Sequence, residues 1–317
     1  MRVERADLEA SLSDLVRSVR DPRAGILGPE SFAWVVGRES ILIAGGGRAA
    51  LLQLAHPFVA HGVAKHSVAL TDQRGRFQRT FANVFAMVFG DLDRAVASAR
   101  RVYATHERVR GAMDETSGKF TAGSAYDANH EEALFWVHAT LVDSALQVFD
   151  LFVRPLRYEE RDAYYQDLKR VARLFGITDR VMPRSWRDFE VYFDKMVNEV
   201  LTVGTPARQI ANAILTGPNR VLDPAFALLR NVTAGLLPEK TRAQFGLPFG
   251  RKERLLFRAT LRAERAVYAL LPSSLRYFPA YQTAMRRVLG ERTRRRDRWG
   301  RTAHRWIIKT LLNPAKV

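Results

Sequence analysis

The sequence predicts an all-α protein, a single multi-helix domain with a basic helical C-terminal extension. Apolar residues recur at three- and four-residue intervals along most of the 317 residues, the spacing of one buried helix face. Gly and Pro stand where helices should end. Neither an internal repeat nor a long linker interrupts this pattern, which favours one domain. We expect an N-terminal helix in residues 1–24, the helical domain in 25–260 and the extension in 261–317.

Capping residues and helix breakers place the individual elements. Gly90 should close one helix and Asp91 should cap the next. Asn129, with Glu132 three residues later, forms a potential capping box before a long apolar run. Residues 114–129 are irregular and could hold a short hairpin. The other expected boundaries are Pro155, Gly176, Pro206 and Pro238. Helices are expected at about 5–20, 30–37, 40–55, 58–66, 73–89, 92–112, 130–153, 158–175, 185–200 and 206–216, with more between 222 and 313.

The composition excludes several kinds of chemistry. The chain has no cysteine, so disulfides, thiolate zinc sites, iron–sulfur clusters, a cysteine nucleophile and covalent c-type haem are ruled out. The N-terminus lacks the apolar core of a signal peptide, and no window approaches a membrane span of about 20 apolar residues. We therefore expect a cytoplasmic protein.

The net charge of +17 is concentrated near the C-terminus. Nine arginines stand between Arg286 and Arg305 against two acidic residues, with Trp299 and Trp306 within or beside the run. One interpretation is a solvated tail. Another is docking on an anionic membrane surface, peripherally, or on a partner. Nucleic acid is not expected, because the chain has no signature of a known nucleic-acid module.

A glycine-rich stretch resembles a dinucleotide-binding turn. Gly45, Gly47 and Ala50 follow an apolar segment in G-x-G-x-x-A spacing, and Asp72 lies where a ribose-binding acid would be needed. An NAD(P)-binding fold would require further strand–helix alternation, whereas helical patterns follow. The alternative is a buried helix whose small residues let a neighbouring helix approach closely.

Three histidines raise the question of a metal centre. His56, His61 and His66 are five residues apart, so they cannot share one face of a continuous helix. No H-E-x-x-H pattern occurs, and no glutamate stands three residues before a histidine. A zinc or di-iron site is therefore not expected.

Two further histidines lie in apolar helical stripes. His106 shares a stripe with Ala99, Val102 and Tyr103 despite the arginines beside it in the chain, and His138 lies within a uniformly apolar helix. Such a histidine can simply be part of the core. A neutral imidazole among apolar helices is also what a non-covalent haem iron needs as an axial ligand.

Four ordered blocks resemble one family. GRAALLQLAHPFVAHGVAKHS, GRFQRTFANVFAMVFGD, ARRVYATHERVRG and EALFWVHATLVDS are similar to the MpaB-type oxygenases, relatives of the rubber oxygenases called latex-clearing proteins. The resemblance extends over about residues 25 to 260. It implies a globin-like helical core and a non-covalent haem b. It also implies that His106, in the H-x-x-V-R-G block, is the proximal iron ligand.

The same resemblance suggests distal residues and a reaction. Arg76, Arg79 and Thr80 match the distal side of the relatives, except that Arg79 stands where they have lysine, and a guanidinium is a poor iron ligand. These residues, with His138 as a second cofactor-binding candidate, complete the expected site. We expect a haem-dependent oxygenase that uses dioxygen on a hydrophobic alkene, isoprenoid or lipid-like substrate. The alternatives are a haem sensor or carrier and a haem-free helical binding module.

Overall fold

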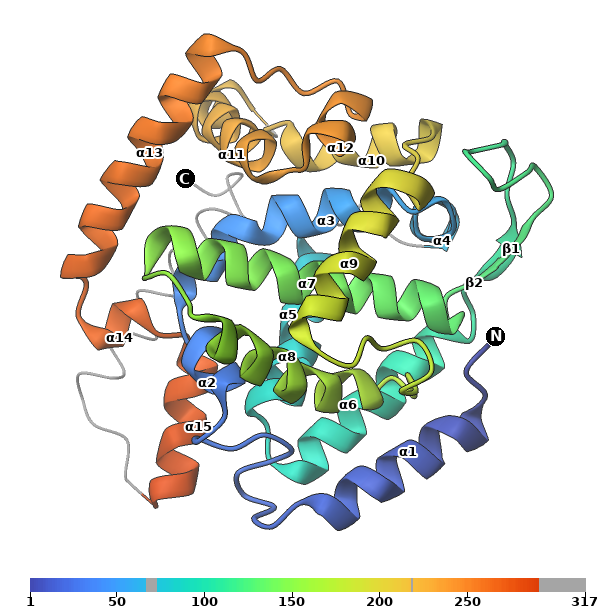
Figure 1. Ribbon diagram of the computed structural model, residues 1–317, viewed down its shortest axis with the longest axis vertical. Coiled ribbons are helices and arrows are strands. Elements are labelled where there is room, and N and C mark those ends of the chain that lie inside the picture. Colours follow the sequence, from blue (N-terminus) through green and yellow to red (C-terminus); the bar gives the residue numbers. More distant parts are fainter. Residues whose placement is uncertain (67–72, 218, 291–317) are drawn as a thin grey trace.

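The computed structural model describes residues 1–66, 73–217 and 219–290, without the side chains of residues 73, 74, 76 and 77. Within these ranges the protein is built almost entirely of helices (Figure 1). The α-helices are α1 (Arg5–Ser18), α2 (Phe32–Gly37), α3 (Gly46–Leu54), α4 (Pro57–His66), α5 (Gln73–Phe89), α6 (Leu92–His106), α7 (Glu131–Phe152), α8 (Tyr158–Arg173), α9 (Trp186–Lys195), α10 (Thr205–Leu215), α11 (Asp223–Leu236), α12 (Glu239–Gln244), α13 (Arg251–Leu270), α14 (Ser273–Arg276) and α15 (Pro279–Leu289). Three short helical segments complete the set: η1 (Ser40–Gly45), η2 (Met196–Val200) and η3 (Arg220–Leu222).

Helix α7 is the central element of the fold. It runs through the middle of the molecule, with α3 and η1 on one side and α8 on the other (Figure 1). Its residues are apolar on nearly every face, including the fully buried Trp136 and Phe135, and a helix that is hydrophobic all round must be enclosed. The main buried cluster includes residues from Val3 to Ala284. This continuous core confirms the predicted all-α single domain.

Two predicted helices end or break earlier than expected. The helix predicted at 92–112 ends at His106, and the chain continues into strand β1 (Arg110–Ala112), antiparallel to β2 (Ala125–Asp127). The predicted hairpin therefore exists but starts before residue 114. Gly111 makes this pairing possible, because a Cβ there would lie 2.6 Å from the hydroxyl of Tyr126. The helix predicted at 40–55 is divided into the 3₁₀ segment η1 and helix α3.

Some predicted caps are correct and one is wrong. The Asp91 side chain accepts a hydrogen bond from the Arg94 backbone N–H at the start of α6. By contrast, the N-cap of α7 is His130, and the predicted capping box of Asn129 with Glu132 does not form. Asn129 is instead buried, 1% exposed, one residue before the cap. Its side chain is thereby available to a different partner.

The glycine-rich stretch is helical, so the dinucleotide interpretation is wrong. Residues 40–54 form η1 and α3, and the only sheet in the described ranges is the β1–β2 pair. Gly47 faces α11 so closely that a Cβ would lie 2.2 Å from Thr233 Oγ1, and at Gly45 a Cβ would lie 2.9 Å from Val148. The small residues therefore admit neighbouring helices, as the alternative proposed. Asp72 lies outside the described residues.

The C-terminal helices are tied to the domain through a buried carboxylate. Glu39 is completely buried and accepts hydrogen bonds from Arg276 and from the Tyr268 hydroxyl, each at 2.8 Å. The arginine-rich tail beyond Gly290 lies outside the described residues. No helix in the part of the chain that the structure describes is long and apolar enough to cross a membrane.

Candidate functional site

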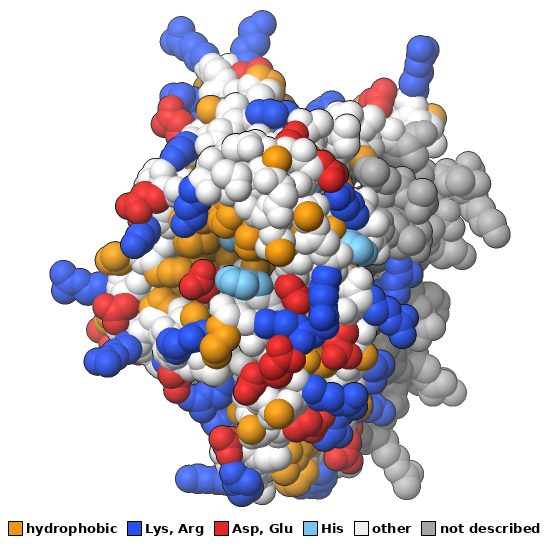
Figure 2. Space-filling model, turned by 90° about the vertical axis from the view of Figure 1, so that its right-hand side faces the viewer, with side chains coloured by type: hydrophobic (Ala, Val, Ile, Leu, Met, Phe, Trp, Pro, Cys, Tyr) orange, Lys and Arg blue, Asp and Glu red, His pale blue; other side chains and the backbone are white. Residues whose placement is uncertain are grey.

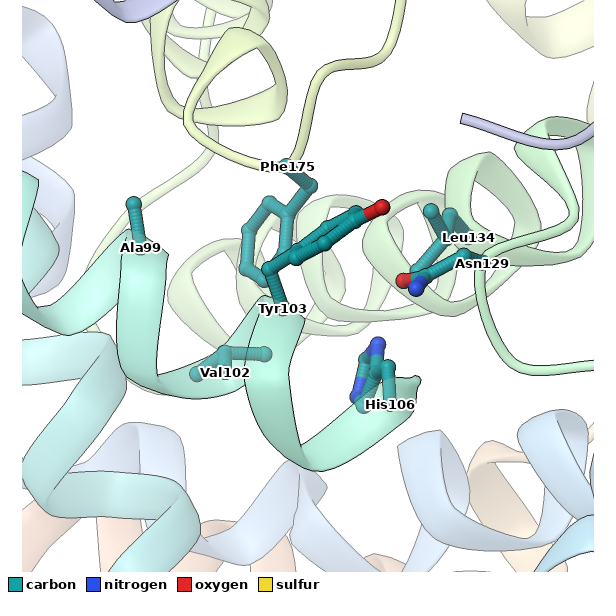
Figure 3. A pocket seen from close by; sticks show the side chains of 7 residues that line it. All are labelled: Ala99, Val102, Tyr103, His106, Asn129, Leu134 and Phe175. Carbon is teal, nitrogen blue, oxygen red and sulfur yellow. The ribbon is translucent and has the colours of Figure 1, made fainter. Parts of the chain in front are cut away.

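His106 lies in the last turn of α6 and borders a small internal void. The space between its lining side chains is too narrow for even one molecule of water. His106 and Asn129 lie on one side of it and the rings of Tyr103 and Phe175 on the other (Figure 3). The remaining lining residues are Ala99, Val102 and Leu134. The predicted apolar stripe of α6 therefore does surround the histidine as far as the helix extends.

The surroundings of His106 keep its imidazole neutral. Burial lowers the pKa of His106 to about 4, although a hydrogen bond with the Asn129 side chain and the charge of Asp127 act in the opposite direction. Burial disfavours the charged imidazolium, so the ring is uncharged near pH 7. One ring nitrogen is engaged by Asn129. The second ring nitrogen can bind a metal, because a neutral imidazole keeps a lone pair on one of its nitrogens.

His138, the other inward-facing histidine, is enclosed more completely. It is 5% exposed on α7, and burial lowers its pKa to about 4. The ring donates a hydrogen bond to the backbone carbonyl of Leu168 in α8, while Nε2 has no partner. Its ring centroid lies 6.4 Å from that of Phe135. His138 does not line the void at His106.

The predicted distal residues lie on α5, the helix that packs beside α6. Arg79 and Thr80 are exposed in the first half of α5, and neither lines the void at His106. The side chain of Arg76 lies outside the described part of the chain. The described structure therefore does not bring these predicted residues together with His106.

His56, His61 and His66 do not converge on a common point. His61 is buried and its Nδ1 lies 2.9 Å from the carbonyl oxygen of Pro57, whereas Nε2 of His66 lies 2.9 Å from the Tyr126 hydroxyl. His56 precedes α4 and faces a different region. Among the described residues no group of three or more His, Asp or Glu side chains could hold a metal ion.

An open cleft at the N-terminal end of α7 went unrecognised in the sequence. It offers about 290 Å³ to water-sized molecules, and on that face of the molecule hydrophobic side chains gather around a hollow with histidine at its edge (Figure 2). Its walls come from α4, the 113–124 loop, α7, α9 and η2. The lining residues are His56, Phe58, Lys119, Phe120, His130, Glu132, Phe135, Arg180, Val181, Tyr192, Met196 and Val200.

The cleft combines aromatic walls with one buried polar side chain that lacks a partner. The Phe58 and Phe120 rings lie 4.7 Å apart, and His56 lies 5.6 Å from Phe120. His56 is 5% exposed and its Nδ1 has no hydrogen-bond partner. Burial, reinforced by the nearby charges of His130 and Lys119, lowers the pKa of His56 to about 4. The cleft therefore presents a neutral hydrogen-bonding group within an apolar surround.

One wall of the cleft carries a feature often found at functional sites. Segment η2 is a π-helix that contributes Met196 and Val200, and single π-turns are frequent at such sites. The first turns of α7 separate the cleft from the void, because Leu134 lines the void and Phe135 lines the cleft. The wall residues come from segments far apart in the chain, so no local sequence pattern marks them.

Comparison with known proteins gives one result. The family model described as the catalytic domain of ER-bound oxygenase mpaB/B′ and rubber oxygenase matches residues 33–266, more than half of the chain. Searches of curated proteins and of solved structures found no match.

Proposed function

The chain belongs to the family of MpaB and rubber oxygenase catalytic domains and is therefore an enzyme of the oxygenase type; we propose that it depends on haem b. In this proposal His106 holds the haem iron. The observation that carries this proposal is the neutral imidazole of His106, engaged on one side by Asn129 and bordered by apolar side chains. A histidine can serve as an axial ligand of haem iron only when its imidazole is uncharged. The proposed substrate is a hydrophobic alkene, isoprenoid or lipid-like molecule.

Asn129 would position the ligand. Metal-bound histidines usually donate their second ring N–H to an acceptor that fixes the orientation of the ring. The side chain of Asn129 is buried and hydrogen-bonded to His106, which suits it for this role. Its Nδ2 has no partner, in keeping with an amide that is oriented by its oxygen.

The neutral imidazole of His106 is suited to bind haem iron, but the space beside it is too small for a haem. It has no room even for water, and ligand pockets usually measure about 300–1,000 Å³. Side chains around His106 would have to move apart on binding. A bound haem supplies the iron centre for dioxygen chemistry, and the apolar residues Ala99, Val102 and Leu134 would keep water away from it.

The distal role remains assigned to α5. Arg76, Arg79 and Thr80 would act as hydrogen-bond donors on the distal side once haem is held, because fixed donors stabilise developing negative charge. Removing one such donor typically lowers the rate about 10²–10³-fold. Arg79→Ala and Thr80→Val should therefore keep haem and lose most turnover, measured as oxygen uptake and carbonyl products from an alkene. Wild-type turnover in both variants would refute the distal assignment.

The absorption spectrum of purified protein supplied with haemin tests the haem proposal. We expect a Soret band that His106→Ala abolishes without loss of helical circular dichroism. His138→Ala is the matched control, since it removes another neutral histidine that faces inward from a helix, and it should retain haem. If His138→Ala loses the band and His106→Ala keeps it, the ligand is on α7.

A second candidate function is the binding of a hydrophobic ligand without haem. The cleft at His56 favours this function, because it has room for a ligand where the void at His106 has none. A protein that shows no Soret band after addition of haemin, yet binds an apolar fluorescent probe that His56→Phe excludes, would support this second function over the first.

A further inference from the structure

Helix α13 presents an unusual outer face. It forms one outer edge of the molecule, where no other labelled helix lies beyond it (Figure 1). Its inner face is set by Phe257 and Leu261, which pack against a small core cluster that contains Val148 and Val232. Thr260 and Tyr268 are also buried on this side, and the opposite side of the helix is exposed to solvent.

Half of this outer face is apolar. Leu255 and Val267 are each 61% exposed and Leu270 is 86% exposed. At about 100° of rotation per residue, the apolar positions fall within a sector of about 120°. This apolar stripe consists of Leu255, Leu256, Ala259, Ala263, Ala266, Val267 and Leu270, all of which are exposed. Large exposed aliphatic side chains gathered on one helix mark an interaction surface.

The other half of the outer face is basic. The basic stripe consists of Arg251, Arg254, Arg258, Arg262 and Arg265, at intervals of three or four residues. All five are exposed, and within the described part of the chain none forms an ion pair with a carboxylate. The two acids of α13 are turned away, since Glu253 caps Gly250 and Glu264 is partly buried.

We propose that the outer face of α13 docks on an anionic phospholipid bilayer. A helix with adjoining apolar and cationic stripes lies in the plane of a membrane, its apolar side among the acyl chains and its cations beside the headgroups. A second copy of this chain is disfavoured as the occupant, because pairing two such faces would bring two rows of arginines together. The exposed arginines, which pair with no carboxylate of the described residues, and the exposed leucines therefore point to one flat anionic partner.

Membrane docking would place the enzyme where a hydrophobic substrate is concentrated. This consequence depends on the proposed function, whereas docking itself does not, because it uses residues of α13 only. Vesicle binding can be measured without haem or turnover, so failure of the oxygenase proposal would leave the docking proposal intact, and the reverse also holds.

Co-sedimentation of the full chain with vesicles tests the proposal. Vesicles of phosphatidylcholine alone are compared with vesicles that contain about one third phosphatidylserine, at low and high salt. We expect binding only to the anionic vesicles and a steep loss at high salt. Each basic residue near an anionic surface contributes about fivefold to affinity, so Arg258→Gln with Arg262→Gln should weaken binding about 30-fold.

Substitutions elsewhere provide matched controls. Leu255→Gln with Leu270→Gln should reduce binding at least tenfold, whereas Val191→Gln, at an exposed apolar position on α9, should not. Arg187→Gln, also on α9, is the control for charge. Unchanged circular dichroism confirms that each variant is folded.

Three results would overturn the proposal. The first is undiminished vesicle binding by both α13 double variants. The second is loss of binding only when the tail arginines Arg294, Arg295 and Arg296 are replaced by glutamine, which would assign docking to the tail. The third is a concentration-dependent dimer, seen by light scattering, that the leucine variants dissolve, which would assign the face to a second copy.

Discussion

Replacing Asn129 with leucine should weaken haem binding while leaving the stability of the fold nearly unchanged. Asn129 is 1% exposed, and its side chain is hydrogen-bonded to the His106 ring. Leucine has nearly the same size and shape, so the packing around the void should be kept. The change removes the amide oxygen that holds the imidazole.

The expected effect on stability is small because two terms oppose each other. The substitution leaves one ring N–H of His106 without its acceptor, and an unsatisfied buried group costs about 1–3 kcal/mol. It also removes Nδ2 of Asn129, a buried donor that already has no partner, and so relieves a penalty of the same kind. The free energy of unfolding should therefore change by no more than about 1 kcal/mol.

The expected effect on haem is larger. Loss of the partner that orients a metal-bound histidine typically costs about 10–100-fold in metal affinity. Haemin titration followed at the Soret band measures this ratio, and urea denaturation of the haem-free protein measures the stability. Asn129→Asp, which keeps an acceptor oxygen, should retain tight binding.

Two outcomes would refute the reasoning. If Asn129→Leu binds haemin as tightly as the wild type, Asn129 does not position an iron ligand. If affinity falls only in proportion to a large loss of stability, Asn129 is structural and the neutral His106 serves the core alone.

Three further predictions concern stability. In His138→Leu, the slope of unfolding free energy against pH between about 4.5 and 6 should fall by roughly 1.4 kcal/mol per pH unit. The His138 pKa of about 4 keeps the ring neutral in the folded protein, whereas in the unfolded chain the ring gains a proton below about pH 6.5. The stability that the wild type has above about pH 6.5 is therefore lost as the pH falls toward 4. If urea denaturation at a series of pH values gave the same slope for His138→Leu and the wild type, the prediction would be wrong. Gly47→Ala should lower the free energy of unfolding by about 1–3 kcal/mol through overpacking, since its Cβ would lie 2.2 Å from Thr233 Oγ1. Adding Thr233→Ala should restore the melting temperature. If it does not, the contact with Thr233 does not cause the loss of stability. Glu39→Ala should cost about 1–3 kcal/mol, because it takes the buried acceptor away from the Tyr268 hydroxyl and from the partly exposed Arg276. Glu9→Ala, which removes an exposed ion pair, should cost only about 0.2–1 kcal/mol. Equal losses in chemical denaturation would show that burial does not matter here.

Much of the helical order could be predicted because it depends on local interactions. The apolar spacing around His106 and His138 marked both as inward-facing. The structure confirms that His138 is buried, whereas His106 is partly exposed with its ring beside Val102 and Tyr103. Asp91 could be recognised as a cap because a cap bonds to residues two or three positions away. The end of α6 was misplaced, since the pairing of Gly111 with Tyr126 lies across a hairpin loop.

The sequence by itself determined that this chain is a helical protein without cysteine chemistry, and it marked out the blocks that resemble MpaB-type oxygenases. Periodicity, caps and composition are local properties, so they can be read along the chain. They also left Gly45 and Gly47 ambiguous between a nucleotide turn and a helix contact, since the same small residues serve both.

The tertiary structure decided which groups meet. Asn129 could cap α7 or bond to His106, and only the packing of α6 against the start of α7 selects the second role. The cleft is assembled from segments as distant as His56 and Val200. Contacts between residues far apart in the chain depend on how whole helices pack, because each such pairing is stabilised by the shared core rather than by its own neighbours in sequence.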